Sequence, residues 1–510
     1  MARELTSRFI LKGTLTASTA LHVGGIGGDA DTDMALAVNG RGKYYLPGTS
    51  IAGVMRQWIR HRFPLEADSV WGASDVTHDA QKSVGLASCM FVEDAVAKLP
   101  DGANIEIRDG VGIDRFSGTA AHGIKYDRTV LPAGTQFPLE VTADVLGVED
   151  RQPVLAQLAD LVVEMKAGRL RFGASKTRGL GRVELRGVAV REQTMSTRDG
   201  MLAALAMGGE VVAPDVLAAA ASGALPRPRL TLTVHWKPKG PFMVKAARDG
   251  MQVDSLPLTG WNGQKLRLLL PGSSVKGALR SHAELIMRTV RGLPAPRVTT
   301  KGTDFLDQVD DVPLVTALFG ATGDRDERLG IGALATEDCY SVLTLDPTAW
   351  ANVERAEGLR QLESALKEAS ALTVRQAYHV AIDRWTGGAA DGQLFSVLEP
   401  HPVAWEPIRL EVDLARIPEA ERKAALALLL LVLQDLGAGE IPLGFGANRG
   451  MGSIEVDWID VSHLDLPEPL SRALAGVERI EDIGEAGIPP TIIDELQPAW
   501  TSYVESGASC

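Results

Sequence analysis

The stretch HVGGIGGDADTDMALAVNGRGKYYLPGTSIAGVMRQWIR, residues 22–60, contains a Gly/Asp-rich loop, a short strand pattern and the start of a helix. The stretch GMQVDSLPLTGWNGQKLRLLLPGSSVKGALRSHAELIMR, residues 250–288, repeats this order. In both, Leu-Pro-Gly and two hydroxyl residues precede apolar residues at helical spacing. We expect Thr49 or Ser50 to cap the first helix, because a short hydroxyl accepts bonds from free N–H groups.

Three further pairs of segments extend the repeat, and they occur in the same order in both halves. They are VWGAS (70–74) with LFGAT (318–322), GIDRFSGTAAHG (112–123) with AIDRWTGGAADG (381–392), and SKTRGLGRVEL (175–185) with GANRGMGSIEV (446–456). Collinear pairs of this kind indicate a duplication. The spacing between paired segments grows along the chain, which places insertions in the second copy around 290–314 and 340–375.

Each copy follows the order strand, helix, several strands, helix, strand. The alternating patterns FILKGTLTAST (8–18) and RLTLTVHWKP (229–238) supply the first strand of each. This order predicts an α+β fold of two tandem, elaborated ferredoxin-like or RRM-like domains. The predicted parts are a first domain at 1–191, a linker at 192–226, a second domain at 227–462 and a tail at 463–510.

The bulk composition limits the possible partners. A net charge of -13 over 510 residues argues against a generally basic nucleic-acid binder, so any such contact needs a local Lys/Arg stripe. The three cysteines form no Cys-x-x-Cys pair, which argues against a zinc knuckle or a disulfide framework. The longest apolar run, ALALLLLVL (425–433), is too short to span a bilayer, and MARELTSRFI is not a signal peptide. We therefore expect a cytoplasmic protein with no membrane partner and read the apolar run as a buried helix.

Two repeated elements are candidates for phosphate contact. The helix starts combine backbone N–H groups with hydroxyls and with basic pairs four residues apart, and the second Gly-rich element adds further cations. The candidate residues are Ser50, Arg56, Arg60, Lys176, Arg178, Ser273, Ser274, Lys276, Arg280 and Arg449. The alternatives are a capped helix with a solvated basic face and a tight helix-to-strand turn.

Acidic residues mark the loops before these helices. Asp29, Asp31 and Asp33 lie in the first loop, and Asp249 and Asp254 lie in the second. Loop carboxylates suit Mg²⁺ or Mn²⁺ and can position a nucleophile, although a solvated acidic loop has the same composition.

Two other features leave alternatives open. His22 can act as an acid or base in a metal-independent ribonuclease, or it can be a structural core histidine. Asp114-Arg115 and Asp383-Arg384 are either structural ion pairs or parts of RNA-contacting hairpins.

Taken together, these motifs resemble the RAMP superfamily over roughly 1–190 and 227–460. The first copy contributes LHVGG, LPGTSIAGVMR, VWG, GIDR, LPAGTQF and SKTRGLGRV, and the second contributes VDSLPL, LPGSSVKGALR, LFG, AIDR and GANRGMG. In detail the chain is similar to the type III CRISPR backbone subunits that polymerise along guide RNA. A tandem fusion of two such domains is similar to the double backbone subunit of type III-D effectors.

The resemblance implies a crRNA-binding subunit of an antiviral ribonucleoprotein, with target single-stranded RNA and other type III effector subunits as partners. It implies a thumb-like hairpin that inserts between guide and target, and a loop aspartate that carries out metal-dependent cleavage of the target. Asp33 and Asp254 match the placement of that aspartate and would bind the Mg²⁺ or Mn²⁺, with Asp31 as the fallback in the first copy. The guide-contacting lysine of the family matches Lys276, whereas the first copy has Ala52 there.

Two other functions remain open on the sequence. One is an RNA-binding structural subunit of the same complex that does not cut. The other is a metal-independent guide-processing ribonuclease that uses His22.

Overall fold

The computed structural model describes residues 4–25, 32–64, 66–74, 85–223, 228–263, 265–297, 305–306, 308–309, 312–321, 330–468 and 470–506. The chain forms two compact units that do not follow chain order. Unit 1 consists of Met1–Ile105, Val130–Lys176 and Gly181–Leu225, and unit 2 consists of Glu106–Thr129, Thr177–Leu180 and Pro226–Cys510.

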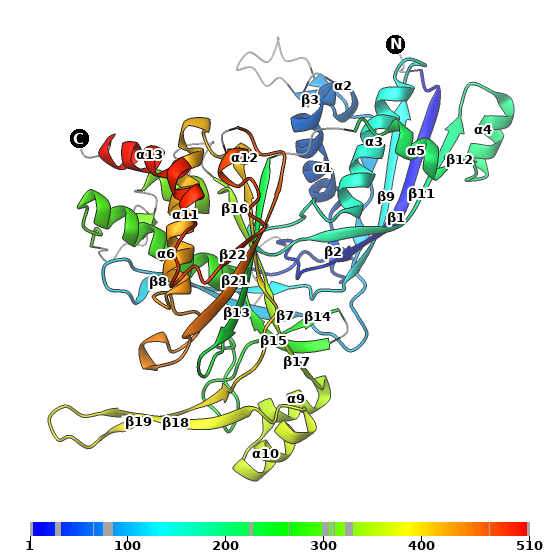
Figure 1. Cartoon of the computed structure of the whole chain (residues 1–510). Coiled ribbons are helices and arrows are strands. Elements are labelled where there is room, and N and C mark those ends of the chain that lie inside the picture. Colours follow the sequence, from blue (N-terminus) through cyan, green and yellow to red (C-terminus); the bar gives the residue numbers. More distant parts are fainter. Residues whose placement is uncertain are drawn as a thin grey trace. The chain divides into compact units, whose positions relative to one another are not determined.

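Unit 1 is built on a five-stranded sheet in the order β12-β11-β1-β9-β5 (Figure 1). Its strands are β1 (Ser7–Ala17), β5 (Met90–Val92), β9 (Gln136–Val145), β11 (Val183–Thr194) and β12 (Glu210–Val211), and all neighbours are antiparallel. The strand β1 alternates between buried and less buried residues, and its Phe9, Leu11 and Leu15 enter the core. This is the period-two pattern that the sequence shows at 8–18.

Two helices supply the other half of the unit 1 core. They are α1 (Gly48–Arg62), which buries Ile51, Met55 and Ile59, and α3 (Arg151–Lys166). The shorter elements of the unit are α2 (Ala67–Trp71), α4 (Arg198–Leu205), α5 (Pro214–Ala220), β2 (Tyr45–Leu46), β3 (Ala73–Ser74), β4 (Gly85–Leu86) and β6 (Ala95–Val96).

Unit 2 contains a six-stranded sheet in the order β10-β16-β20-β13-β21-β22. Its strands are β10 (Arg178–Gly179), β13 (Arg229–Pro238), β16 (Leu334–Glu337), β20 (Ile408–Asp413), β21 (Ile454–Leu464) and β22 (Arg479–Glu481). A second sheet joins β14 (Thr259–Asn262), β15 (Lys265–Leu270) and β17 (Cys339–Leu345). The helices are α6 (Gly272–Arg291), α8 (Pro313–Phe319), α9 (Pro347–Arg355), α10 (Leu359–Glu368), α11 (Arg422–Gly437), α12 (Leu470–Ala473) and α13 (Pro490–Ser506).

The two units share one topology. In unit 1 the central strands run β11-β1-β9-β5, and in unit 2 the matching strands run β21-β13-β20-β16. Counted along each copy, both orders read fourth, first, third, second, with one helix after the first strand and one after the third. This is the ferredoxin-like arrangement, and the predicted α+β class is confirmed.

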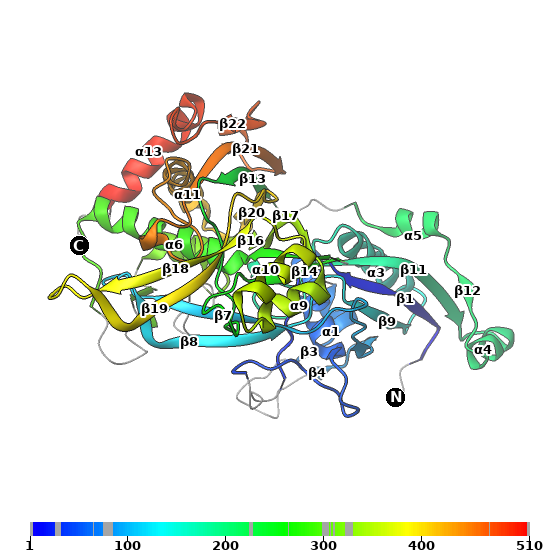
Figure 2. The same cartoon turned by 90° about the horizontal axis from the view of Figure 1, so that it is seen from below.

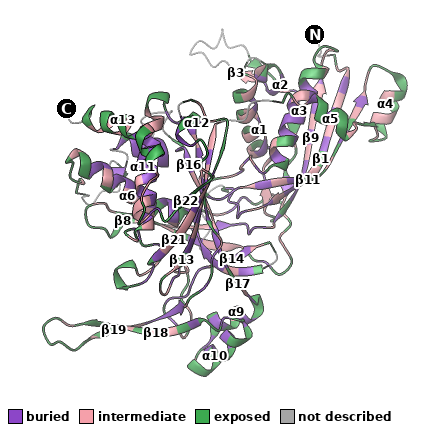
Figure 3. Ribbon diagram, in the orientation of Figure 1, coloured by how far each residue is buried: buried purple, intermediate pink, exposed green. Residues whose placement is uncertain are grey.

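Two long hairpins stand outside the sheets, and both belong to unit 2 apart from the last residue of the first. They are β7 (Glu106–Ile113) with β8 (Ala120–Val130), and β18 (Val374–Ile382) with β19 (Ala389–Pro400). The turn of each is the repeated Ile-Asp-Arg segment. Figures 1 and 2 show β18–β19 reaching out from unit 2, and Figure 3 shows its tip as exposed.

Several local predictions can be compared with these elements. The predicted hydroxyl cap is wrong, because α1 begins at Gly48 with Pro47 at the N-cap position and no capping side chain. The predicted buried helix at 425–433 is confirmed, since the run lies in α11 and is almost wholly buried. The stretch 192–226 contains α4, β12 and α5, and the tail contains α13; the domain bounds themselves stay predictions. None of the described helices is long and apolar enough to cross a membrane.

Candidate nucleic-acid interface

The start of each repeated helix holds a carboxylate from its own unit. The Gly48 N–H donates to Asp94 Oδ1 at 2.7 Å, and the Gly272 N–H donates to Asp338 Oδ1 at 2.9 Å. An acceptor with negative charge is stabilising at this end of a helix. The first amide of each helix is therefore occupied by the protein, and this amide is not available to a phosphate.

The Leu-Pro-Gly glycines are required by close backbone packing. A Cβ at Gly48 would lie 2.2 Å from the Val92 carbonyl oxygen, and one at Gly272 would lie 2.9 Å from that of Thr336. The helix start and the strand that precedes the aspartate thus approach too closely for any side chain.

We expect Gly48→Ala to destabilise the protein by about 1–3 kcal/mol, because the strand backbone at Val92 must move. The matched control is Gly53→Ala in the same helix, where an added Cβ meets nothing within 4 Å. That change should stabilise the helix by about 0.5–1 kcal/mol. Thermal and urea unfolding of the two variants measures the difference, and equal shifts would contradict the packing argument.

The equivalent arginines of the two repeated helices, Arg56 and Arg280, have structural partners. A guanidinium nitrogen of Arg56 donates to the Gly72 carbonyl, and Arg280 Nη1 donates to the Gly320 carbonyl at 2.7 Å. These glycines belong to the repeated VWGAS and LFGAT segments. In both copies the repeated helix is therefore bonded to the repeated glycine segment, which gives both motifs a structural role. Arg280 also bonds to Val309 O and Glu284.

Lys276 is buried rather than available at the surface. It is 4% exposed, and its Nζ donates to the Leu334 carbonyl at 2.6 Å. Burial, reinforced by the positive charges of Arg178, Arg280 and Arg416, lowers the pKa of Lys276 well below its ordinary value. In this structure the side chain holds β16 against α6.

The lowered pKa of Lys276 predicts a pH dependence of stability. Between the folded pKa and the ordinary Lys value of about 10.4, the unfolded chain binds a proton that the folded chain does not. The free energy of unfolding of the wild type should therefore rise with pH in that window, relative to Lys276→Met. Urea unfolding from pH 7 to 10 measures the difference, and parallel curves for the two proteins would contradict it.

The predicted acidic residues differ in their settings. Asp31 lies outside the described residues, and Asp33 is exposed in the loop before β2. Asp254 is exposed as well, but its Oδ2 accepts bonds from Ser396 N–H at 2.7 Å and Ser396 Oγ at 3.0 Å. The hydrogen bond from the Ser396 amide is the largest cause of a lowered pKa at Asp254. Because Ser396 lies on β19, the carboxylate is fixed at the base of the second hairpin.

The other predicted cations are at or near the surface. Arg60 forms an exposed ion pair with Asp68 at 2.6 Å. Arg178 is exposed in β10, Lys176 is partly buried, and Ser50, Ser273 and Ser274 are partly or fully exposed near the helix starts. Arg449 is exposed, with its guanidinium 5.1 Å from the centre of the Phe395 ring. An arginine over an aromatic ring offers a flat, charged surface.

His22 has a structural setting. It is a buried residue, and its carbonyl accepts a bond from Ala174 N–H in the first Gly-rich turn. Gly173 in that turn has a φ of 78°, and a Cβ there would lie 2.2 Å from the His22 carbonyl oxygen. The turn is thus glycine-rich because it packs closely against the backbone of the segment that contains His22.

The two Ile-Asp-Arg segments have different environments. Arg115 does not pair with its neighbour Asp114 but with Glu284 of α6, at 2.6 Å. Asp114 accepts a bond from Gln308 at 2.8 Å. Partial burial tends to raise the pKa of Asp114, but bonds from Gln308 and Ser117 outweigh it and lower the pKa to about 2. In the first copy the segment is therefore structural, whereas its counterpart in the second copy is at an exposed tip.

The two copies of the fold share their helix starts and their hairpin turns. The model of the RAMP superfamily matches residues 14–184 and 261–455, which is more than half of the chain. The chain belongs to the RAMP superfamily. A search of curated proteins found no match. Membership implies a CRISPR-associated RNA-binding subunit, and the superfamily includes some ribonucleases.

The sequence patterns did not predict several residues of this RAMP chain that hold the helix starts and the first hairpin in place. Asp94 and Asp338 follow strands as the last residues of FVED and ATED, and this repeated Glu-Asp pair was a signal that could have been found. Glu106, Arg108 and Glu284 had no such signal. Arg108 bonds to Asp338 at 2.6 Å and to Glu106 at 3.1 Å, so the first hairpin is tied to the capped start of α6.

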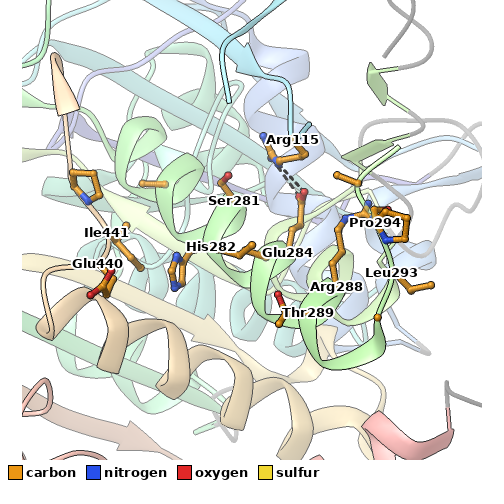
Figure 4. A pocket seen from close by; sticks show the side chains of 15 residues that line it. Arg115, Ser281, His282, Glu284, Arg288, Thr289, Leu293, Pro294, Glu440 and Ile441 are labelled. Atoms are coloured by element: carbon orange, nitrogen blue, oxygen red, sulfur yellow. Dashed lines mark hydrogen bonds and ion pairs between the residues drawn. The ribbon is translucent and has the colours of Figure 1, made fainter. Parts of the chain in front are cut away.

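A cavity of about 720 Å³ opens beside the docked tip of the first hairpin in this RAMP protein (Figure 4). Arg115, Glu284 and Arg288 line one part of it, and Glu440 and Ile441 line another. His282 points toward Asp435, with Nε2 at 2.6 Å from a carboxylate oxygen. The cavity mixes both signs of charge, and so its lining does not favour an anionic ligand.

Proposed function

We propose that this chain is a crRNA-binding backbone subunit of a type III CRISPR effector complex that also cleaves guide-paired target RNA. In unit 1, Arg60, the partly buried Lys176 and Ser50 would contact RNA phosphates. In unit 2, Arg178, Arg449, Ser273 and Ser274 would do so. The exposed β18–β19 hairpin would cross the RNA as a bridging arm, whereas the tip of the first hairpin is bonded to α6. The buried Lys276, Arg56 and Arg280 are left out of this contact set, because they hold the fold together.

The observation that carries the cleavage proposal is the position of Asp254. Its carboxylate is exposed, and Ser396 fixes one of its oxygens at the base of an arm. A carboxylate with a lowered pKa stays ionised at neutral pH, as a metal ligand or a residue that orients water must be. In the first copy the exposed Asp33 would supply the corresponding carboxylate.

The residues present fit a divalent ion that is held mainly by its substrate. No group of three His, Cys, Asp or Glu side chains gathers among the residues that the structure describes. Mg²⁺ commonly binds one or two carboxylates and completes its shell with substrate phosphates and water. In this proposal Asp33 and Asp254 each supply a carboxylate, and the bound Mg²⁺ or Mn²⁺ supplies the charge that activates water and stabilises the leaving oxygen.

The test uses the assembled complex with guide RNA and a labelled matched target. With Mg²⁺, Asp33→Ala and Asp254→Ala should each remove a different product band. Asp249→Ala is the matched control, because Asp249 lies in the same loop as Asp254 but pairs with Lys245 at 3.1 Å. That variant should leave both bands in place.

The alternatives predict other results. Unchanged bands in both aspartate variants would overturn the catalytic assignment. If the wild type binds target RNA but does not cleave it, the result would favour the alternative that this chain is an RNA-binding structural subunit. Cleavage that survives EDTA would favour a metal-independent ribonuclease, for which the buried His22 is poorly placed.

A further inference from the structure

We propose that Lys245 binds the phosphate of the target RNA next to Asp254, and that the acidic loop of the first copy has no equivalent cation. This inference rests on the proposed function, because it adds a residue that touches the target at the second of the two proposed cleavage sites. As a consequence, the two sites need different concentrations of Mg²⁺.

The two acidic loops have the same backbone pairing. The bonds are Gly25 N–H to Ala35 O at 3.0 Å and Ala37 N–H to Val23 O at 2.8 Å in the first, and Ala246 N–H to Leu256 O at 2.8 Å and Leu258 N–H to Val244 O at 2.7 Å in the second. Each residue of one set lies 221 positions from its counterpart in the other, and the same separation relates Asp33 to Asp254 and Gly24 to Lys245. The two aspartates are therefore equivalent, whereas the counterpart of the lysine is a glycine.

The two loops differ in charge. Residues 22–37 contain three aspartates and no Lys or Arg, whereas residues 243–258 contain two basic and two acidic residues. A phosphate that approaches the first loop is repelled by its carboxylates until metal ions neutralise them. The second loop carries cations of its own, so less of the neutralising charge has to come from bound Mg²⁺.

Neighbouring elements of unit 2 hold the second loop in place. The Ser255 N–H donates to the Ser396 carbonyl at 3.1 Å, next to the two bonds that Ser396 donates to Asp254. At the tip of the loop, the Met251 N–H donates to the carbonyl of Glu354 in α9 at 3.2 Å. The lysine and the aspartate of this loop thus extend from a backbone that is fixed before RNA binds. Charges held in this way act on a reacting group without first having to be rearranged.

Lys245 has a weakly held partner and is available to a phosphate. Its Nζ lies 3.1 Å from Asp249 Oδ1, and the exposed fractions of the two side chains are 39% and 62%. An ion pair that is so exposed adds little to stability and is screened by salt. The bond from the Ser396 amide is the largest cause of the lowered pKa of Asp254, and the positive charge of Lys245 contributes to it as well. A phosphate that replaces Asp249 as the partner of Lys245 is therefore within reach of Asp254.

Acetylation of lysines tests the contact without metal and without cleavage. The assembled complex with guide RNA is treated with sulfosuccinimidyl acetate in EDTA, either alone, with a matched target or with an unmatched RNA, and mass spectrometry measures the label on each lysine. The matched target should remove most of the label from Lys245, and the unmatched RNA should not. Lys367, an exposed residue of α10, should be labelled equally in all three samples. Equal labelling of Lys245 with and without matched target would overturn the proposal.

Cleavage rates in Mg²⁺ then test what the contact does. Lys245→Met should slow the formation of the product band that Asp254→Ala removes by roughly ten- to a hundredfold, less than the loss of a donor from a closed site, and should leave the other band unchanged. Lys245→Arg should keep most of the rate, because the positive charge remains. Asp249→Ala breaks the ion pair but keeps the lysine, so both bands should form at the wild-type rate. A band that does not respond to Lys245→Met, or two bands that slow together, would contradict the assignment.

A titration with Mg²⁺ compares the two copies. The band that depends on Asp33 should need more Mg²⁺ for half of its maximal rate than the band that depends on Asp254. Gly24→Lys should lower that requirement, and the position accepts a side chain, because an added Cβ meets only His22 Nε2, at 3.6 Å, within 4 Å in the described part of the chain. Equal requirements in the wild type, or a first band that ignores Gly24→Lys, would overturn the inference. If the wild type cuts no target and the matched target still protects Lys245, the proposed cleavage fails while the phosphate contact stands.

Discussion

Asp338→Ala is expected to lower the free energy of unfolding by about 3–5 kcal/mol, because it leaves a buried arginine without its main partner. The Asp338 side chain is fully buried and accepts bonds from Gly272 N–H and from Arg108 Nη1. Burial alone would lower the pKa of Arg108, but the carboxylates of Asp338 and Glu106 raise it above its ordinary value. Without Asp338, the Arg108 guanidinium and the Gly272 N–H both lose their hydrogen-bond acceptor.

Asp94→Ala is the matched control for this prediction. Asp94 makes the same bond to the start of α1, but it is exposed and the described residues provide no equivalent of Arg108 beside it. Its loss should cost about 0.5–2 kcal/mol, the usual range for a helix cap. Urea unfolding of both variants measures the two costs. Equal losses would show that the Arg108 bond contributes little.

Glu284→Ala is expected to destabilise the protein by a similar amount, about 3–5 kcal/mol, and to free the first hairpin. Glu284 is 1% exposed and pairs with both Arg115 and Arg280, at 2.6 Å and 3.0 Å. Its removal leaves two largely buried guanidinium groups without their carboxylate. Hydrogen exchange should then speed up in residues 106–129 more than in the strands of the sheet.

The control for this second prediction is Leu285→Ala, which changes the next residue of α6. Leu285 is more than half exposed, so its truncation removes little buried surface. It should leave exchange in 106–129 unchanged. Protection of the hairpin that survives Glu284→Ala would mean that apolar packing against Phe305 and Val309 is enough to hold it.

The sequence repeats predicted the fold well, because duplication leaves marks that short-range patterns preserve. The alternating residues of β1 and β13 and the apolar face of α1 determine which side of each element meets the core. What the repeats could not show is that Glu106–Thr129 belongs to unit 2. That placement depends on pairs far apart in the chain, such as Arg108 with Asp338 and Arg115 with Glu284.

The candidate site was harder to predict for a related reason. A lysine or arginine after Leu-Pro-Gly has the same appearance in sequence whether it meets solvent or a carbonyl. Lys276 and Arg280 meet carbonyls of Leu334 and Gly320, which come from distant segments. Asp254, in contrast, lies in a loop that the structure leaves exposed, as loop carboxylates usually are.

The first hairpin, which precedes most of unit 2 in the chain but packs within it, is also made before its packing partners during synthesis on the ribosome. Residues 106–129 emerge well before α6, Phe305 and Val309, against which the hairpin packs. With roughly 180 residues still to be made at about 5–20 residues per second, the hairpin waits on the order of ten to forty seconds for these packing partners. During that time an apolar, charged arm extends from the nascent chain. A slow stretch of translation after residue 129 would lengthen this exposure, and chaperone binding to the arm would then protect the chain from misassembly.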